Sequence, residues 1–196
     1  ATIHEGYTTI TAECLLYRSA KRYILHTVVL YGTLNVSSLA DKSMTEPDSR
    51  LMVQQAMRAA FPAAEARVAT FYQMQEYHLG WRDLQLQPAE SDPGKLIRPL
   101  LVLLSCAAAG GDTAQALPLA AGVQLLHDFT LIHDDIEDNS DTRRGRPTLW
   151  SVWGLAQGIN AGDGMFVLAH LAIHRLADVG VPPARALAVL RRFDEV

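Results

Sequence analysis

The sequence predicts an all-α fold, and two observations support this prediction. From about Asp48 onward, apolar residues recur at three- and four-residue spacing in one segment after another, as they do along one face of a helix. After residue 50, the sequence has no segment that alternates polar and apolar residues as a half-buried strand would. With 196 residues, 49% of them apolar, the chain can bury the core that such a bundle needs.

Helices are expected at about residues 50–61, 63–79, 95–109, 113–138, 160–177 and from 182 onward. Pro62 suits the first turn of the second helix, because a first-turn proline loses no helical hydrogen bond. The third helix is expected to be mostly buried and to end at Gly110. Asp112 is the expected cap of the fourth helix, and Pro147 is expected to open a short extra one.

Residues 1–43 read differently from the rest. The stretch 23–36, "YILHTVVLYGTLNV", is β-branched and aromatic like a strand, yet no partner strand follows it in the sequence. A lone strand or hairpin is marginally stable in water. We therefore expect residues 1–43 to be an extension outside the native fold and residues 44–196 to form the domain. The alternative is a small N-terminal subdomain.

Composition excludes several classes of function. A net charge of −4 creates no general attraction for nucleic acid or an anionic membrane. The sequence has no apolar run of the eighteen or so residues that a transmembrane helix needs. Cys14 and Cys106 are too few for a disulfide framework or a zinc site, so a reducing, cytoplasmic setting is the default expectation.

The stretch "LIHDDIEDNSDTRRGRP" places several carboxylates at the end of an apolar helix. Residues four apart lie about 40° apart around a helix, so Asp134 and Asp138 should project from one ridge. Asp135 lies about 100° further round and is a candidate secondary ligand. Two such carboxylates repel unless a cation lies between them. Mg²⁺ prefers oxygen ligands and commonly shares its shell with substrate phosphates, so it fits this pair.

Arginines follow the acidic ridge at once. Arg143, Arg144 and Arg146 lie in a loop that contains Gly145, and guanidinium groups bind phosphate oxygens bidentately. Acids followed by arginines therefore indicate a metal–diphosphate site. The alternative is a solvated helix end where acids and arginines neutralise one another.

A second basic cluster lies in "DPGKLIRP". Lys95 and Arg98 are three residues apart, which predicts one helix face near a helix N-terminus that itself attracts anions. His127 lies two turns before Asp134 on almost the same face. The alternatives are two basic side chains lying along an apolar helix and an ordinary core histidine.

Together these residues resemble the trans-isoprenyl diphosphate synthase (polyprenyl synthetase) family, from about Arg50 to Val196. The family's DDxxD followed by an arginine pair and Gly-x-Pro is matched by "DDIEDNSDTRRGRP". Its GKxxRP is matched by "GKLIRP", and its NAGD at a helix start by Asn160–Asp163. The resemblance implies an isoprenoid-synthase-type helical bundle. It also implies a prenyltransferase, a homodimer when complete, that joins an allylic diphosphate head-to-tail to isopentenyl diphosphate.

The resemblance also implies residue roles. Asp134 and Asp138 would bind the Mg²⁺ that holds the allylic diphosphate, with Asp135 assisting and Arg143 contacting the same diphosphate. Isopentenyl diphosphate would be bound by Lys95, Arg98, His127 and Arg144.

The family's chain-length positions precede the first aspartate by four and five residues, and here they are Thr130 and Phe129. A bulky aromatic residue at the position of Phe129 resembles the pattern of the short-chain enzymes, most of all those that make a geranylgeranyl product. The alternative is that Phe129 is ordinary core packing.

One family feature is not found in this sequence. The second aspartate-rich motif has no counterpart after Asp163, which predicts a bundle incomplete at its C-terminus and a truncated, poorly active fragment.

A non-catalytic partner subunit of a complete synthase is one alternative. A class I terpene cyclase would share the acidic ridge but has no use for Lys95, Arg98 and Arg144. The His-Asp pairs also suggest an HD-type metal phosphohydrolase, but those enzymes use dispersed histidine ligands.

Overall fold

The computed structural model describes residues 46–63 and 65–195, so the expectation about residues 1–43 lies outside the described residues. Within the described part, strands are limited to one two-residue hairpin, β1 (Thr142–Arg143) paired with β2 (Arg146–Pro147). The helices are α2 (Glu46–Ala59), α3 (Ala66–His78), α4 (Ile97–Ala108), α5 (Thr113–Glu137), α6 (Leu149–Trp153), α7 (Leu155–His174) and α8 (Pro183–Asp194). The all-α prediction is confirmed.

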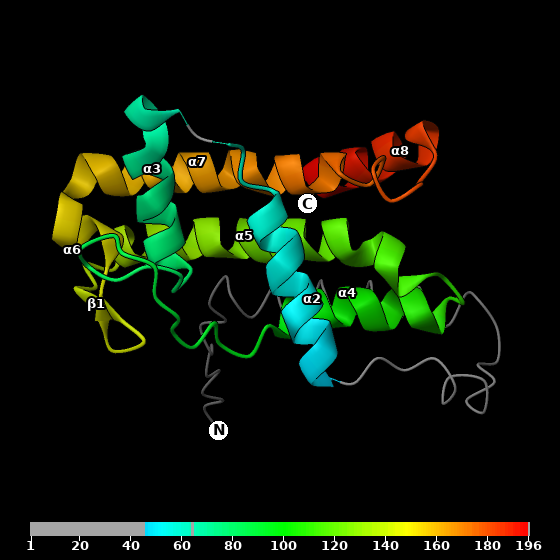
Figure 1. The fold of residues 1–196 in the computed structure, drawn as a ribbon, viewed down its shortest axis with the longest axis horizontal. Helices are drawn as coiled ribbons and strands as arrows, with labels where there is room; N and C mark the ends of the chain where they lie inside the picture. Colours follow the sequence, from blue (N-terminus) through cyan, green and yellow to red (C-terminus); the bar gives the residue numbers. More distant parts are fainter. Residues whose placement is uncertain (1–45, 64, 196) are drawn as a thin grey trace, which may run out of the picture. The chain divides into compact units, whose positions relative to one another are not determined.

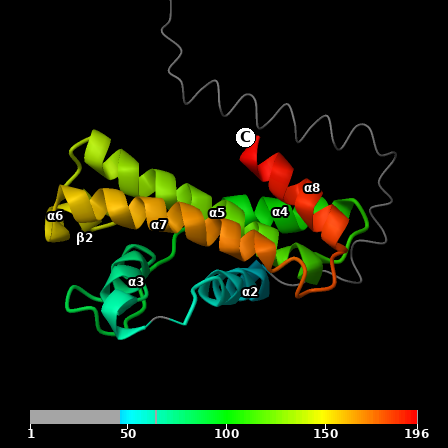
Figure 2. The same cartoon turned by 90° about the horizontal axis from the view of Figure 1, so that it is seen from above.

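Helices α5 and α7 pack side by side along most of their length (Figures 1 and 2). Small residues permit this approach, because Ala121 on α5 and Ala169 on α7 are fully buried. A Cβ added at Gly122 would lie 2.7 Å from Ile173 Cγ1, so the glycine is required by the distance between the helices. The pair therefore forms the rigid centre to which the other helices attach.

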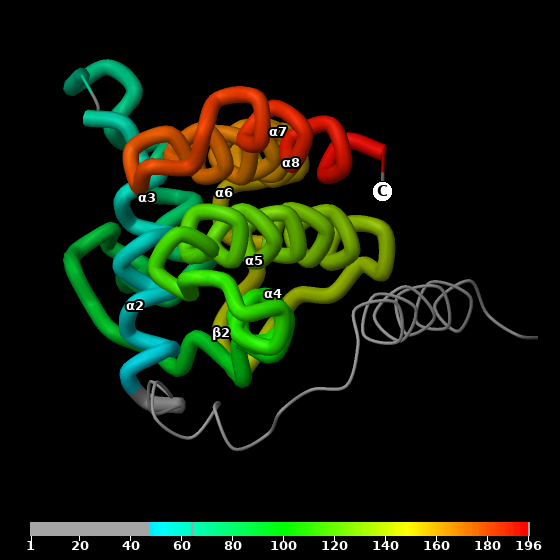
Figure 3. The backbone as a smooth tube through the Cα atoms, turned by 90° about the vertical axis from the view of Figure 1, so that its right-hand side faces the viewer, coloured from blue at the N-terminus to red at the C-terminus, as the bar shows by residue number. Residues whose placement is uncertain are grey.

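The remaining helices cover this pair on two sides. Figure 3 shows α5 between α7 and α4, with α2 and α3 crossing along one side. The core lies where these elements meet and includes Val53 of α2, Leu125 of α5 and Met165 of α7, all fully buried. Asp112 caps α5 as predicted, accepting a hydrogen bond from the Ala114 amide at 2.9 Å.

Three predicted helix starts were wrong. Pro62 does not open the second helix, because the chain turns at Ala60 and Phe61 and inserts the Phe61 ring against Trp81, 5.5 Å between centroids. The third helix begins at Ile97 rather than Lys95, because Leu96 has left-handed dihedral angles with φ of 48°. The NAGD segment lies inside α7, which already begins at Leu155.

Helix α4 is also more exposed than expected. Its buried residues are Pro99 and Leu103, whereas Ile97 and Leu104 are 55% and 64% exposed. In the described part of the chain, α4 packs on α5 and α2 with one face, and its opposite apolar face has no such cover. None of the described helices is both long and apolar enough to cross a membrane.

Candidate functional site

The acidic ridge lies at the C-terminal end of α5. Asp134 and Asp138 are both exposed, one helical turn apart, and the Asp138 amide donates to the Asp134 carbonyl at 2.8 Å. Within the described residues, no three His, Cys, Asp or Glu side chains are gathered closely enough to hold a metal ion. Two exposed carboxylates nevertheless fit Mg²⁺, because this ion commonly binds one or two carboxylates and completes its shell with water and phosphate.

Asp135 is placed differently from the other two acids. Its side chain is 3% exposed and accepts from Arg143, whose Nε donates to Oδ1 at 2.9 Å and to Oδ2 at 3.0 Å and whose Nη2 lies 2.8 Å from Oδ1. Burial raises the pKa of Asp135, and the hydrogen bond and charge of Arg143 oppose that rise. Asp135 therefore holds the hairpin against α5 in this structure, and its expected role as a secondary metal ligand stays a prediction.

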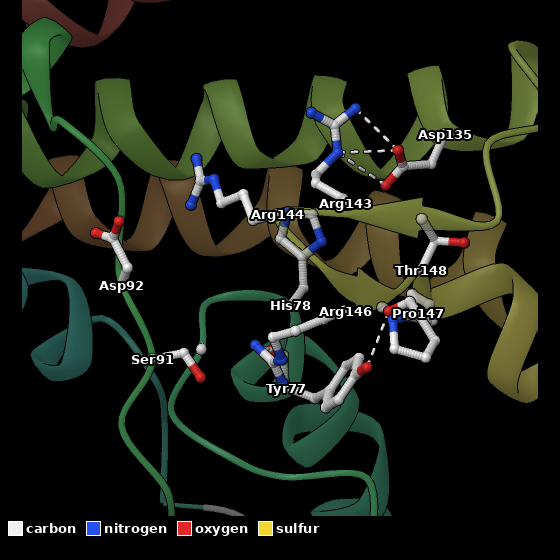
Figure 4. Close-up of a pocket in the computed structure, with 12 residues that line it drawn as sticks. Tyr77, His78, Ser91, Asp92, Asp135, Arg143, Arg144, Arg146, Pro147 and Thr148 are labelled. Atoms are coloured by element: carbon white, nitrogen blue, oxygen red, sulfur yellow. Dashed lines mark hydrogen bonds and ion pairs between the residues drawn. The ribbon is translucent and has the colours of Figure 1, made fainter.

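The three arginines of the hairpin point in three directions (Figure 4). Arg144 and Gly145 form its turn with φ of 52° and 74°, the left-handed conformations that a two-residue hairpin turn requires. Because of this turn, Arg144 points away from Arg143 and donates to the Pro93 carbonyl at 3.0 Å. Arg146 lies over the Tyr77 ring and donates to the Tyr77 carbonyl, so it is a structural anchor for the hairpin.

The second basic cluster is assembled from separate segments. Arg98 Nη1 lies 3.0 Å from His127 Nε2, and because arginine can only donate, His127 accepts with a neutral ring. Burial, followed by the charges of Arg98, Arg144 and Arg143, lowers the pKa of His127 to about 4. The Arg144 guanidinium lies against Gly94, where an added Cβ would be 3.0 Å from Cζ. Lys95 follows Gly94 and is exposed.

Of the residues predicted to form this cluster, Arg98, His127 and Arg144 are thus brought together, with Lys95 beside them. Lys95 reaches this place from the loop before α4 and not from the predicted helix face. A pocket of about 120 Å³ lies next to the cluster, between the hairpin and the end of α3. Arg143, Arg144 and Arg146 line it together with Ser91. A pocket lined by several guanidinium groups is suited to a phosphate-bearing ligand.

Sequence reasoning missed a buried pair behind this pocket. His78 Nε2 lies 3.8 Å from Asp128 Oδ1, and their side chains are 7% and 5% exposed. Gln124 donates to the second oxygen of Asp128 at 3.0 Å. An acid and a glutamine four residues apart within the apolar run of α5 was the available signal, because unpaired charges are rarely buried.

Burial sets the charge of this pair. It lowers the pKa of His78 to about 3, assisted by the charges of Arg143, Arg144 and Arg146. Burial also raises the pKa of Asp128 to about 6, against the Gln124 hydrogen bond and the nearby arginines. Near neutral pH, His78 is therefore neutral and Asp128 is a buried carboxylate beneath the arginine cluster.

The two predicted chain-length positions differ in their surroundings. The half-buried Phe129 ring lies 4.8 Å from the His133 ring and 5.3 Å from the Phe166 ring, centroid to centroid. Thr130 is exposed, and its hydroxyl donates to the His127 carbonyl at 2.8 Å. Phe129 thus packs against α7 with part of its ring and leaves the rest accessible.

Comparison with known proteins gives one consistent family. A model described as polyprenyl synthetase matches residues 85–196, more than half of the chain. A (2E,6E)-farnesyl diphosphate synthase of Mycobacterium bovis is 40% identical over 136 residues, 64% of this chain and 38% of that protein. A geranylgeranyl diphosphate synthase of Mycobacterium tuberculosis is 46% identical over 120 residues, 61% of this chain and 33% of that protein.

Solved structures agree with this result. A polyprenyl synthetase from Streptomyces coelicolor A3(2) matches with a TM-score of 0.62 and 36% identity over 74% of this chain and 41% of that chain. The predicted isoprenoid-synthase-type bundle is therefore confirmed for the matched part. The chain spans about two fifths or less of the length of these relatives.

The buried carboxylate predicts a dependence of stability on pH. Because the pKa of Asp128 rises from 3.8 to about 6 on folding, the folded state binds more protons between these values. The contribution of Asp128 to the free energy of unfolding should then fall as pH rises through this window. Asp128→Asn removes the charge, so the variant should gain as much as about 3 kcal/mol over wild type between pH 4 and pH 7.

Urea unfolding at several pH values measures this difference. Glu90→Gln, at an exposed acid, is the matched control and should track wild type at every pH. An Asp128→Asn difference that does not change with pH would show that Asp128 is not a buried carboxylate of raised pKa.

Proposed function

The chain belongs to the polyprenyl synthetase family, and on that premise we propose that it carries the substrate-binding half of a trans-prenyltransferase. The reaction joins an allylic diphosphate to isopentenyl diphosphate, and the activity is proposed for the enzyme that contains this segment. The observation that carries the proposal is the presence of two separate clusters, the exposed carboxylates that can hold Mg²⁺ and the basic side chains around His127. His127, which contacts Arg98, precedes Asp134 by seven residues on α5, or about 10 Å along the helix.

The acidic ridge is the proposed allylic diphosphate site. Asp134 and Asp138 would hold Mg²⁺ through their exposed carboxylates, with the diphosphate completing the shell. When bound there, Mg²⁺ neutralises charge on the departing diphosphate. Arg143 supports the same site from the hairpin, since it lines the pocket beside Asp135 and can donate to phosphate oxygens.

The second cluster is the proposed isopentenyl diphosphate site. Lys95, Arg98 and Arg144 supply permanent positive charge, and neutral His127 can still donate through its other ring nitrogen. Arg144 is held to the Pro93 carbonyl before any ligand arrives, so little conformational freedom is lost on binding. Burial of His127 beside arginines keeps it neutral, which leaves the arginines' charge for the ligand.

For the product we propose a short prenyl chain, geranylgeranyl diphosphate. The half-buried Phe129 supports this, because part of its bulky ring stays accessible five residues before Asp134, where it would stop a growing chain. The names of the two mycobacterial relatives, a farnesyl and a geranylgeranyl diphosphate synthase, support the short-chain class. The homodimer and the cytoplasmic setting expected from the sequence stay predictions.

The acidic ridge is tested by removing one carboxylate at a time. Asp134→Ala or Asp138→Ala should lower turnover by orders of magnitude, because the cation loses a ligand and the leaving group is less neutralised. Turnover is measured with isopentenyl diphosphate and an allylic diphosphate at saturating Mg²⁺. Glu137→Ala removes an exposed acid from the same turn and should leave turnover nearly unchanged. Near-normal turnover of both aspartate variants would overturn the proposed function.

The division between the two sites is tested at the basic cluster. Lys95→Ala and Arg98→Ala should weaken binding of isopentenyl diphosphate by about 1.5–3 kcal/mol each and affect the allylic substrate less. Steady-state kinetics with each substrate varied in turn separates the two effects. Arg67→Ala, on an exposed arginine of α3, is the control for charge loss alone. An equal loss for both substrates would contradict the division.

Product length is tested at Phe129. Phe129→Ala should shift the products to longer chains, because it removes the bulk proposed to close the channel. Chromatography of the dephosphorylated products measures the shift. Phe71→Ala removes another partly buried aromatic ring, from α3, and controls for loosened packing. An unchanged product length with an intact fold would show that Phe129 only packs the core.

A further inference from the structure

The NAGD segment, Asn160–Asp163, takes no part in either proposed diphosphate site, yet it lies against the acidic end of α5. Gly162 is fully enclosed there, and a Cβ on it would overlap the His133 ring. His133 Nε2 lies 3.3 Å from the Ile159 carbonyl oxygen and 3.8 Å from Asp163 Oδ1. A carbonyl oxygen only accepts, so Nε2 carries a hydrogen and donates across the two helices.

A second glycine of α7 accommodates side chains from another helix in a similar way. A Cβ on Gly164 would overlap two side chains of α3, the Gln75 amide and the Phe71 ring. Gln75 Nε2 donates to the Ala161 carbonyl at 3.3 Å. In both cases a glycine leaves space for a polar side chain from another helix, and the carbonyl three residues earlier accepts its hydrogen bond. Gly162, inside this segment, and Gly164, just after it, therefore accommodate side chains from α5 and α3 respectively.

We propose that His133, whose ring packs against Gly162, is a positioning residue. It fixes the rotation of the last turn of α5 and thereby the direction in which the Asp134 and Asp138 carboxylates point. This inference rests on the proposed function, because the two acids act as metal ligands only under it. His133 immediately precedes Asp134, and its contact with α7 is made within the same helical turn. Around the helix, Asp134 and Asp138 lie about 100° and 140° from His133, so the contact at Gly162 holds the turn without covering the exposed carboxylates.

The physical reason lies in the exposure of the acids themselves. Asp134 and Asp138 point to solvent, so the direction of their carboxylates depends on the orientation of the helix turn that bears them. If the register of the helix shifted by one residue, the turn would rotate by about 100° and the carboxylates would point away from a cation bound between them. On the other side of the turn, Asp135 is held by Arg143. His133 and Asp135 thus tie this turn to α7 and to the hairpin.

The test compares two glycine variants of the 196-residue chain. Gly162→Ala displaces His133, and Gly164→Ala displaces Gln75 and Phe71, so both should lower the free energy of unfolding. Both gain the same helix propensity from alanine, so that contribution cancels in the comparison. Only Gly162→Ala should accelerate amide hydrogen exchange at residues 134–138. It should also weaken Mg²⁺-dependent binding of inorganic diphosphate about 10- to 100-fold, as loss of a ligand-orienting partner does.

Three variants at His133 distinguish its proposed role in orienting the carboxylates from a role in packing alone. His133→Ala should weaken diphosphate binding as Gly162→Ala does. The double variant His133→Ala/Gly162→Ala should recover stability relative to Gly162→Ala alone but not recover binding. His133→Gln places an amide donor near the position of Nε2, so it should restore much of the binding that His133→Ala loses.

Two results would overturn the inference. One is equal exchange at residues 134–138 in the Gly162→Ala and Gly164→Ala variants, and the other is wild-type diphosphate binding by His133→Ala. Absence of Mg²⁺-dependent diphosphate binding in the wild-type chain would overturn the proposed ridge function instead. In that case localised exchange in Gly162→Ala would still support the positioning contact.

Discussion

The close approach of α5 and α7 is the constraint on which the rest of this structure depends. It requires small residues wherever the two helices touch, as at Gly122, where an added Cβ would contact Ile173. It also decides where each functional side chain of α5 can point. The face that packs on α7 is unavailable to ligands, so the exposed acids and His127 must project from the remaining surface. A bundle centre of this kind gives the site its rigidity.

Positive charge gathers around the pocket, and most of it is restrained by the protein itself. Arg143 is held by Asp135, Arg144 by the Pro93 carbonyl, and Arg98 lies against His127. Guanidinium groups held in this way lose less conformational freedom when an anion binds. The buried carboxylate of Asp128 adds a negative charge behind them, at a cost in desolvation that the arginines partly offset.

Sequence reasoning succeeded where spacing along one helix decides the outcome. The four-residue interval between Asp134 and Asp138 produced an exposed ridge, as predicted. It did not anticipate the contact between Asp135 and Arg143, because that contact depends on a turn eight residues later whose direction the sequence does not reveal. It misjudged Lys95 as well, because one left-handed residue, Leu96, delays the helix that was expected to carry it.

The sequence by itself determined the helical class, the cap at Asp112, the acidic ridge and the family resemblance, because these depend on local periodicity and short motifs. Only the tertiary structure decided which side chains meet. The contact of His133 with Gly162, like the burial of Asp128 beside His78, joins segments far apart in the chain. Such contacts depend on how closely two helices approach, and that distance is set by packing of the whole bundle and not by either segment alone.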